Sequence, residues 1–168
     1  MTENPLARYA PFPEPPALIA NYLAERASEQ SVVDGPSPWD LGALPAELLA
    51  PMPDWLDSVC RWLNQTYAWQ PHHVIPPCWA QHEHLAYEIA ALAFARTDAY
   101  EDPGSTVLWH EQYDRFLTRM NNALGKTGDE CRVGRHDHRP ARFQLAAWPP
   151  CTPAAEAARP AAPAEGNA

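Results

Sequence analysis

Five residues between positions 78 and 138 have side chains that commonly bind metal ions. They are Cys78, His82, Cys131, His136 and His138. Thiolates and imidazoles are the usual ligands of tetrahedral zinc sites. Cys78 and His82 are four positions apart, which places both side chains on one face of a helix. No C-x-x-C pair is present, so the pattern differs from a standard zinc finger but is compatible with structural zinc.

Three other interpretations of the same residues stay open. In the simplest, Cys78 packs as a small hydrophobic residue beside an interfacial His82, and this is favoured over zinc. A Cys78–Cys131 disulfide is less favoured than zinc in a reducing compartment. Cys78 could also act as a nucleophile with His82 as its base, since a thiol at a helix N-terminus has a lowered pKa. No orienting carboxylate or oxyanion hole is recognisable, so the sequence assigns no catalytic residue.

The prolines show where long helices can position these ligands. The chain has 20 prolines, crowded into residues 5–53, 71–77 and 140–163. Only Pro103 interrupts residues 78–139, so long helices are expected there.

The apolar spacing in this interval predicts a helical hairpin. The first helix is expected from Pro76-Pro77 to about Tyr100, and the second from Ser105 as N-cap to Gly125 as C-cap. Helices of roughly 30 Å joined by a tight turn are antiparallel, so the chain beyond Gly125 returns to the level of Cys78.

The rest of the chain is expected to support this hairpin. A helix from Pro53-Asp54 to Pro71 has a wide apolar face, on which Trp55, Trp62 and Trp69 are expected in the core. A short helix is expected within residues 17–30. The fold class is therefore mainly α, a three- to four-helix bundle around a long antiparallel hairpin. The helical domain spans 17–148 with its core at 53–131, between a disordered Pro-rich leader (1–16) and a disordered Ala/Pro tail (149–168).

The net charge of -9 argues against general binding to nucleic acid or to an anionic membrane. The one basic stretch consists of Arg132, Arg135, Arg139 and Arg142. These arginines could contact nucleic acid or another anion, but pairing with the protein's own carboxylates is the simpler explanation.

Two tryptophans lie in Pro-rich segments outside the expected helices, Trp39 and Trp148. Each either packs as an anchor or binds a partner protein. No basic N-terminal segment leads into an apolar run, and no apolar window reaches the length of a membrane span. We therefore expect a cytoplasmic protein with reduced cysteines.

Residues 55–131 carry a pattern of aromatic, Cys and His positions: Trp55, Trp62-Leu63, Tyr67, Cys78-Trp79, His82, Leu92, Leu108-Trp109, Asp114 and Cys131. This pattern resembles a domain-of-unknown-function family of actinobacterial plasmids, prophages and integrative elements. The chain departs from the family at Ala80-Gln81, where a second tryptophan is usual, and at Gln112 and Phe116, where histidines are usual. The resemblance implies an accessory protein of mobile DNA with no assigned activity.

Three functions follow as hypotheses. The leading one is a non-enzymatic accessory protein of an actinobacterial mobile element that binds a protein partner; nucleic acid is not an expected partner. The second is a zinc-stabilised, DNA-associated protein that uses residues 132–142. The third is a thiol or metal enzyme at Cys78 and His82. The sequence leaves the oligomeric state open.

Overall fold

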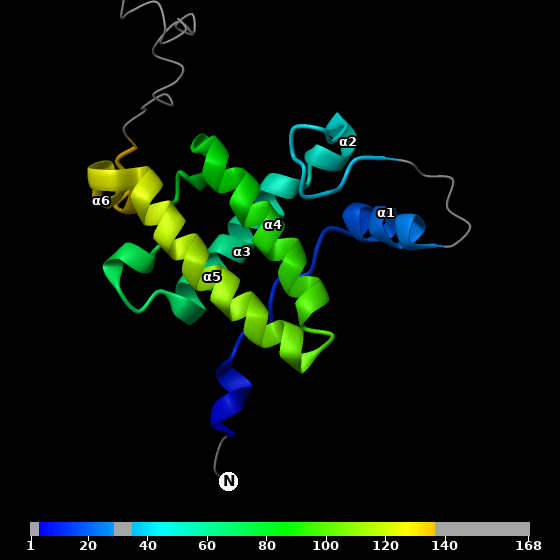
Figure 1. The fold of residues 1–168 in the computed structure, drawn as a ribbon, viewed down its shortest axis with the longest axis horizontal. Helices are drawn as coiled ribbons and strands as arrows, with labels where there is room; N and C mark the ends of the chain where they lie inside the picture. Colours follow the sequence, from blue (N-terminus) through cyan, green and yellow to red (C-terminus); the bar gives the residue numbers. More distant parts are fainter. Residues whose placement is uncertain (1–3, 29–34, 137–168) are drawn as a thin grey trace, which may run out of the picture. The chain divides into compact units, whose positions relative to one another are not determined.

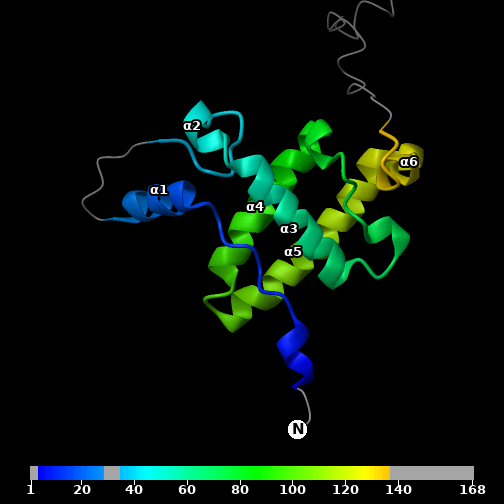
Figure 2. The same cartoon turned by 180° about the vertical axis from the view of Figure 1, so that it is seen from behind.

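A long antiparallel hairpin of two helices forms the centre of the structure (Figure 1). Its arms are α4 (Glu83–Ala99) and α5 (Pro103–Leu124), which lie side by side in Figures 1 and 2. The computed structural model describes residues 4–28 and 35–136, and these belong to one compact unit. The regular secondary structure of the described residues is helical, and they contain no strand. The predicted fold class, a mainly helical bundle around this hairpin, is confirmed.

The second arm begins earlier than the sequence predicted. Asp102 is the N-cap of α5, and its carboxylate accepts a hydrogen bond from the Ser105 N–H at 2.7 Å. Pro103 occupies the first helical position, where its missing N–H has no consequence. The assignment of Ser105 as N-cap is therefore wrong. Gly125 ends the helix at φ +53°, a left-handed conformation that favours glycine, as predicted.

Helix α3 (Met52–Tyr67) packs against the hairpin and supplies one wall of the core. Its buried face meets buried residues of both arms: Trp55, Leu56, Val59, Leu63, Ile89, Phe94, Phe116 and Met120. Trp69 was expected on this face, but its side chain is 82% exposed. The expectation is wrong because the helix ends at Tyr67, so helical spacing no longer places residue 69. None of the described helices is long and apolar enough to cross a membrane.

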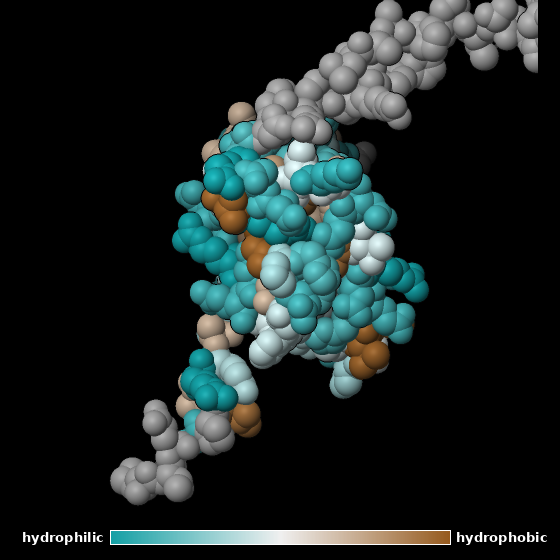
Figure 3. Space-filling model, turned by 90° about the vertical axis from the view of Figure 1, so that its left-hand side faces the viewer, coloured by the Kyte–Doolittle hydropathy of each residue, from teal (hydrophilic) through white to brown (hydrophobic). Residues whose placement is uncertain are grey.

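Shorter helices surround this core. They are α1 (Ala17–Ala27), α2 (Ala46–Leu49) and α6 (Gly128–Arg132), with 3-10 turns at Pro5–Arg8, Pro71–His73, Trp79–Gln81 and Gly125–Thr127. The Trp39 ring lies 6.0 Å from that of Phe94, and 43% of the residue stays exposed. On the face drawn in Figure 3, hydrophobic residues are scattered among hydrophilic ones.

The N-terminal segment differs from the expected disordered leader in residues 4–16. After its 3-10 turn, the segment is attached to α3 through two indole N–H groups, which donate to backbone carbonyls of residues 10 and 13. Prolines restrict φ in the free segment, so less conformational entropy is lost when it binds. The expected tail, residues 149–168, and the part of the helical domain from 137 to 148 lie outside the described residues.

Candidate metal centre

The loop between α3 and α4 positions Cys78, and a side chain of α3 fixes this loop. The Asn64 amide donates to the Ile75 carbonyl at 3.0 Å and accepts from the Ile75 N–H at 2.8 Å. Ile75 and Pro76 are both buried. The chain therefore enters Cys78 on a fixed path. The sequence analysis missed the role of Asn64, although a polar residue between the apolar lines of a core helix was an available signal.

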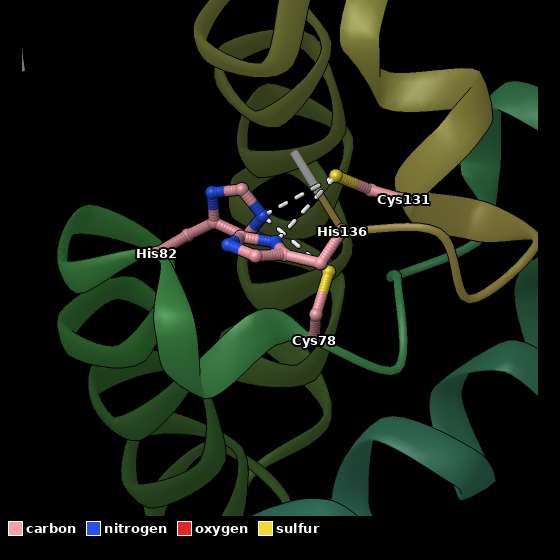
Figure 4. A group of neighbouring side chains, drawn as sticks. All are labelled: Cys78, His82, Cys131 and His136. Atoms are coloured by element: carbon pink, nitrogen blue, oxygen red, sulfur yellow. Dashed lines mark hydrogen bonds between the residues drawn. The ribbon is translucent and has the colours of Figure 1, made fainter. Parts of the chain in front are cut away.

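Cys78 and His82 meet without sharing a helix. A 3-10 turn, Trp79–Gln81, follows Cys78, and His82 is the extended N-cap of α4 with φ -110° and ψ 93°. The expectation that both residues lie in the first turn of one helix is therefore wrong. Their side chains nevertheless converge, because the turn folds back on itself: Cys78 Sγ lies 3.5 Å from His82 Nε2 (Figure 4).

The segment after the hairpin brings the other two ligands to the same point. Cys131 lies on α6 and is fully buried. Gly134, at φ +80°, turns the chain so that His136 faces the site. Cys131 Sγ lies 3.6 Å from His82 Nε2 and 3.9 Å from His136 Nδ1. The return of the chain to the level of Cys78, predicted from the hairpin, is present in the structure.

Arg132 holds α6 in this position. Its guanidinium donates to the backbone carbonyls of His72 and Val74, both at 3.1 Å, and to the Asn121 side chain at 2.6 Å. The side chain is only 9% exposed. Because its donors are used inside the protein, Arg132 does not present the anion-binding surface that the sequence suggested. It links the loop before Cys78, α5 and α6.

Of the other arginines in the basic stretch, the structure describes Arg135. Arg135 is exposed, and its Nε donates to the Glu130 carboxylate at 2.5 Å. This agrees with the simpler explanation, pairing with the protein's own carboxylates. Arg139, Arg142, His138 and Trp148 lie outside the described residues.

The geometry of the cluster fits a four-coordinate metal. The ligand atoms of Cys78, His82, Cys131 and His136 all lie within 4.8 Å of one another. In a tetrahedral zinc site, bond lengths of about 2.3 Å to sulfur and about 2.05 Å to nitrogen place neighbouring S and N atoms about 3.6 Å apart. Three of the four S–N distances here are 3.5, 3.6 and 3.9 Å. These four residues could therefore bind a metal ion with small side-chain adjustments.

The cluster does not resemble an activated thiol. Burial, and then the hydrogen bond and charge of Cys131, raise the pKa of Cys78 to about 11. Without a cation, this thiol is protonated at neutral pH and is a poor nucleophile. A bound metal ion reverses the situation, because a coordinating thiol loses its proton. The local chemistry favours coordination over covalent catalysis.

Comparisons with known proteins add no assignment to this geometry. No protein-family model matches the chain, and neither the curated proteins nor the solved structures contain a match. The resemblance of residues 55–131 to the actinobacterial family stays a prediction. Function is therefore inferred from the Cys/His cluster and from the contacts around it.

Proposed function

We propose that the Cys/His cluster holds one zinc ion in a structural role, and that the protein acts without catalysis by binding a protein partner. One observation carries the metal assignment: two thiols and two imidazoles from separate segments converge on one point. A site with four protein ligands is closed and structural, whereas a catalytic zinc site keeps one position for water or substrate.

The ligand types support zinc over the hard divalent cations. Calcium and magnesium bind oxygen atoms, and the cluster comprises only Cys and His side chains. Thiolate and imidazole ligands in a tetrahedral arrangement are typical of zinc. The metal would join the segment before α4 to the segment after α5, and so close the hairpin at its open end.

The metal assignment is tested by native mass spectrometry of untagged protein purified without chelator. We expect one zinc per chain, lost in Cys78→Ser and in Cys131→Ser. Cys60→Ser is the matched control, because Cys60 is a buried free thiol on α3 outside the cluster. His82→Ala and His84→Ala form a second pair, since His84 is exposed and outside the cluster. A wild-type chain that does not bind stoichiometric zinc would contradict the assignment.

The partner half of the proposal rests on exposed aromatic surface and acidic charge. Trp39 is 43% exposed, although one side of its ring faces Phe94. The mobile-element context comes only from the sequence resemblance. A pull-down from the native host, with Trp39→Ala beside the wild type, tests this half. Repeated failure to recover a partner would contradict it and leave the zinc assignment standing.

A further inference from the structure

The two ends of the segment Tyr9–Pro16 have the backbone conformation of a proline-rich ligand. Its sequence is Tyr-Ala-Pro-Phe-Pro-Glu-Pro-Pro. Tyr9 has φ -78° and ψ 125°, and Pro16 has φ -54° and ψ 141°. Both are close to the polyproline II values of about -75° and +145°. The prolines between them restrict φ to the same range. In Figure 2 this segment is the blue stretch that leads into α1.

Two tryptophans of α3 bind the backbone of this segment. The Trp62 indole N–H donates to the Ala10 carbonyl at 2.9 Å, and the Trp55 indole N–H donates to the Pro13 carbonyl at 3.1 Å. Residues three apart in an ideal polyproline II helix, as the two acceptors would be, are separated by one turn, about 9.3 Å. The two donors are about 10.5 Å apart along α3, on one face. The spacing of donors on one helix matches the spacing of acceptors on the other.

An aromatic side chain lies between the two hydrogen bonds. The Phe12 ring packs edge-on against Trp62, with 5.2 Å between centroids, and Arg96 Cζ lies 4.2 Å from the centre of the same ring. Arg96 also lies 4.8 Å from the centre of the Trp62 ring. None of the ion pairs found among the described residues involves Arg96. We call the surface formed by Trp55, Trp62 and Arg96 the indole groove.

These contacts reproduce a known way of recognising peptides. Domains that bind proline-rich peptides use aromatic-lined grooves, and the preformed helix of the ligand lowers the entropy lost on binding. Here both hydrogen bonds go to main-chain carbonyls, so they do not depend on the side chains of residues 10 and 13. The side chain that packs against Trp62 and Arg96 is an aromatic ring with proline on each side.

We propose that the indole groove is a receptor for proline-rich segments of a partner protein, with Tyr9–Pro16 as its resident competitor. The partner segment has polyproline II conformation and an aromatic residue between prolines. This inference deepens the interaction role proposed above, because it names the partner's chemistry. It does not depend on the metal.

Exchange is physically reasonable because part of the resident segment is exposed. Pro11 and Glu14 are exposed, and Phe12 is half-buried. A short tether gives the resident segment an effective concentration in the millimolar range. A partner segment therefore displaces the resident segment when the ratio of its concentration to its Kd exceeds the same ratio for the resident segment. A change that weakens the resident segment should increase the affinity for an added peptide.

The test uses the full chain and the capped peptide YAPFPEPP, read by the indole N–H signals in two-dimensional NMR. In the Phe12→Ala chain, we expect the peptide to shift the Trp55 and Trp62 signals with a submillimolar Kd. The wild-type chain should bind at least tenfold more weakly, because its own segment competes. A peptide with Ala in place of Phe should not bind. The additional change Trp62→Phe should abolish binding, whereas Trp69→Phe, outside the groove, should not.

A second variant keeps the test decisive if Phe12→Ala loses helicity by circular dichroism. Pro11→Gly/Pro13→Gly loosens the segment without removing an aromatic side chain. Indole signals that stay unmoved at millimolar peptide in a folded variant would overturn the groove proposal. If the chain captures a host partner but does not bind the peptide, only this inference is contradicted, and the proposed interaction role is not. Metal content does not enter the readout, so failure of the zinc assignment is recognised separately.

Discussion

The two ends of the α4–α5 hairpin are held together by different chemistry. At the open end, two thiols and two imidazoles converge, and Arg132 ties the surrounding segments to one another. At the closed end, aromatic rings pack on one another and around Arg96, which lies 3.6 Å from the centre of the Tyr100 ring. The open end is thus built from groups that exchange protons and metal ions. The closed end is built from ring faces.

This contrast separates two contributions to stability. Metal affinity requires deprotonated thiols and neutral imidazoles, so if the proposed zinc is bound, the stability of the open end should depend on zinc concentration and fall in acid. Cation–π and ring contacts depend on neither zinc nor mild acid. The same molecule should therefore respond to a chelator at one end only. The predictions below test this division, from the largest expected effect to the smallest.

Loss of one thiol ligand should produce the largest change. Cys131→Ser should lower the free energy of unfolding by about 4 kcal/mol when free zinc is about 1,000 times its Kd, because metal bound to the native state is lost. Urea unfolding with zinc and with chelator measures this. In chelator, the free energies of unfolding of the wild type and the variant should become similar. Cys60→Ser should lose similar stability in both conditions, and a wild type insensitive to chelator would contradict the division.

Arg132 should have the next largest effect. Arg132→Ala should cost about 2–3 kcal/mol, because two loop carbonyls and Asn121 lose a charged donor. Zinc affinity should fall about tenfold through the misplaced Cys131, as is typical for groups that orient ligands. Arg132→Lys should restore little, since an ammonium lacks the planar fork. Competition with a zinc indicator provides the affinity. If Arg132→Ala lowers the free energy of unfolding but leaves the zinc affinity unchanged, Arg132 has a packing role only.

The closed end should respond to Trp62 and not to zinc. Trp62→Phe removes the donor to Ala10 and should cost about 1 kcal/mol in both zinc and chelator. Combined with Cys131→Ser, its cost should add to within about 0.5 kcal/mol, because the two sites share no partner. A double-mutant cycle in urea measures the coupling. A larger coupling energy would show that the two ends are not independent.

Alkaline pH should weaken the closed end. Burial, and then the hydrogen bond with Tyr100, raise the pKa of Tyr67 to about 12, and burial raises the pKa of Tyr113 and Cys60. A folded pKa above the unfolded value of about 10 means that Tyr67 contributes stability below pH 10 and loses it as pH rises to about 12. After allowance for solvent screening, Tyr67 should contribute a loss of about 1 kcal/mol by pH 11.

Chelator-treated protein isolates this alkaline effect from the metal. Thermal unfolding between pH 8 and 11 measures it, and Tyr67→Phe should flatten the curve. The zinc-dependent part of stability should move in the opposite sense, falling as pH drops below neutrality. If thermal stability falls with rising pH as steeply in Tyr67→Phe as in the wild type, the prediction for Tyr67 is wrong, and Tyr113 and Cys60 cause the loss of stability.

The smallest effect should come from Trp69. Trp69→Ala should change the free energy of unfolding by less than about 0.5 kcal/mol, because exposed side chains outside special contacts rarely matter more. The same truncation at Trp55, which is buried, provides the contrast. A loss above about 2 kcal/mol would restore the core role that helical spacing suggested for Trp69.

The hairpin was predictable because its signals are local. A stretch interrupted only by Pro103, which lies at the start of the second arm, and Gly125 at its end define both arms in the sequence. The convergence of Cys78 with Cys131 followed from that topology. The conformation at His82 was not predictable, because a 3-10 turn and one helical turn both place residues four apart near each other.

The attachment of the N-terminal segment escaped prediction for a different reason. Proline content indicates an extended chain but not whether the chain binds anything. Its acceptors are main-chain carbonyls, which every residue has, so the residue types do not identify them. Phe12, an aromatic residue between two prolines, was the one available signal. The spacing of Trp55 and Trp62 predicts core positions but not the acceptors of their indole N–H groups.

The separation of the four ligands along the chain has a consequence for synthesis. Cys78 and His82 leave the ribosome before either arm of the hairpin exists, and Cys131 and His136 leave it after both. Four-ligand coordination is therefore impossible until the arms have emerged and folded back. A chain truncated within α5 keeps two ligands and lacks two. Retention of zinc would then distinguish finished chains from incomplete ones, so the ion would act as a checkpoint on completion of the hairpin.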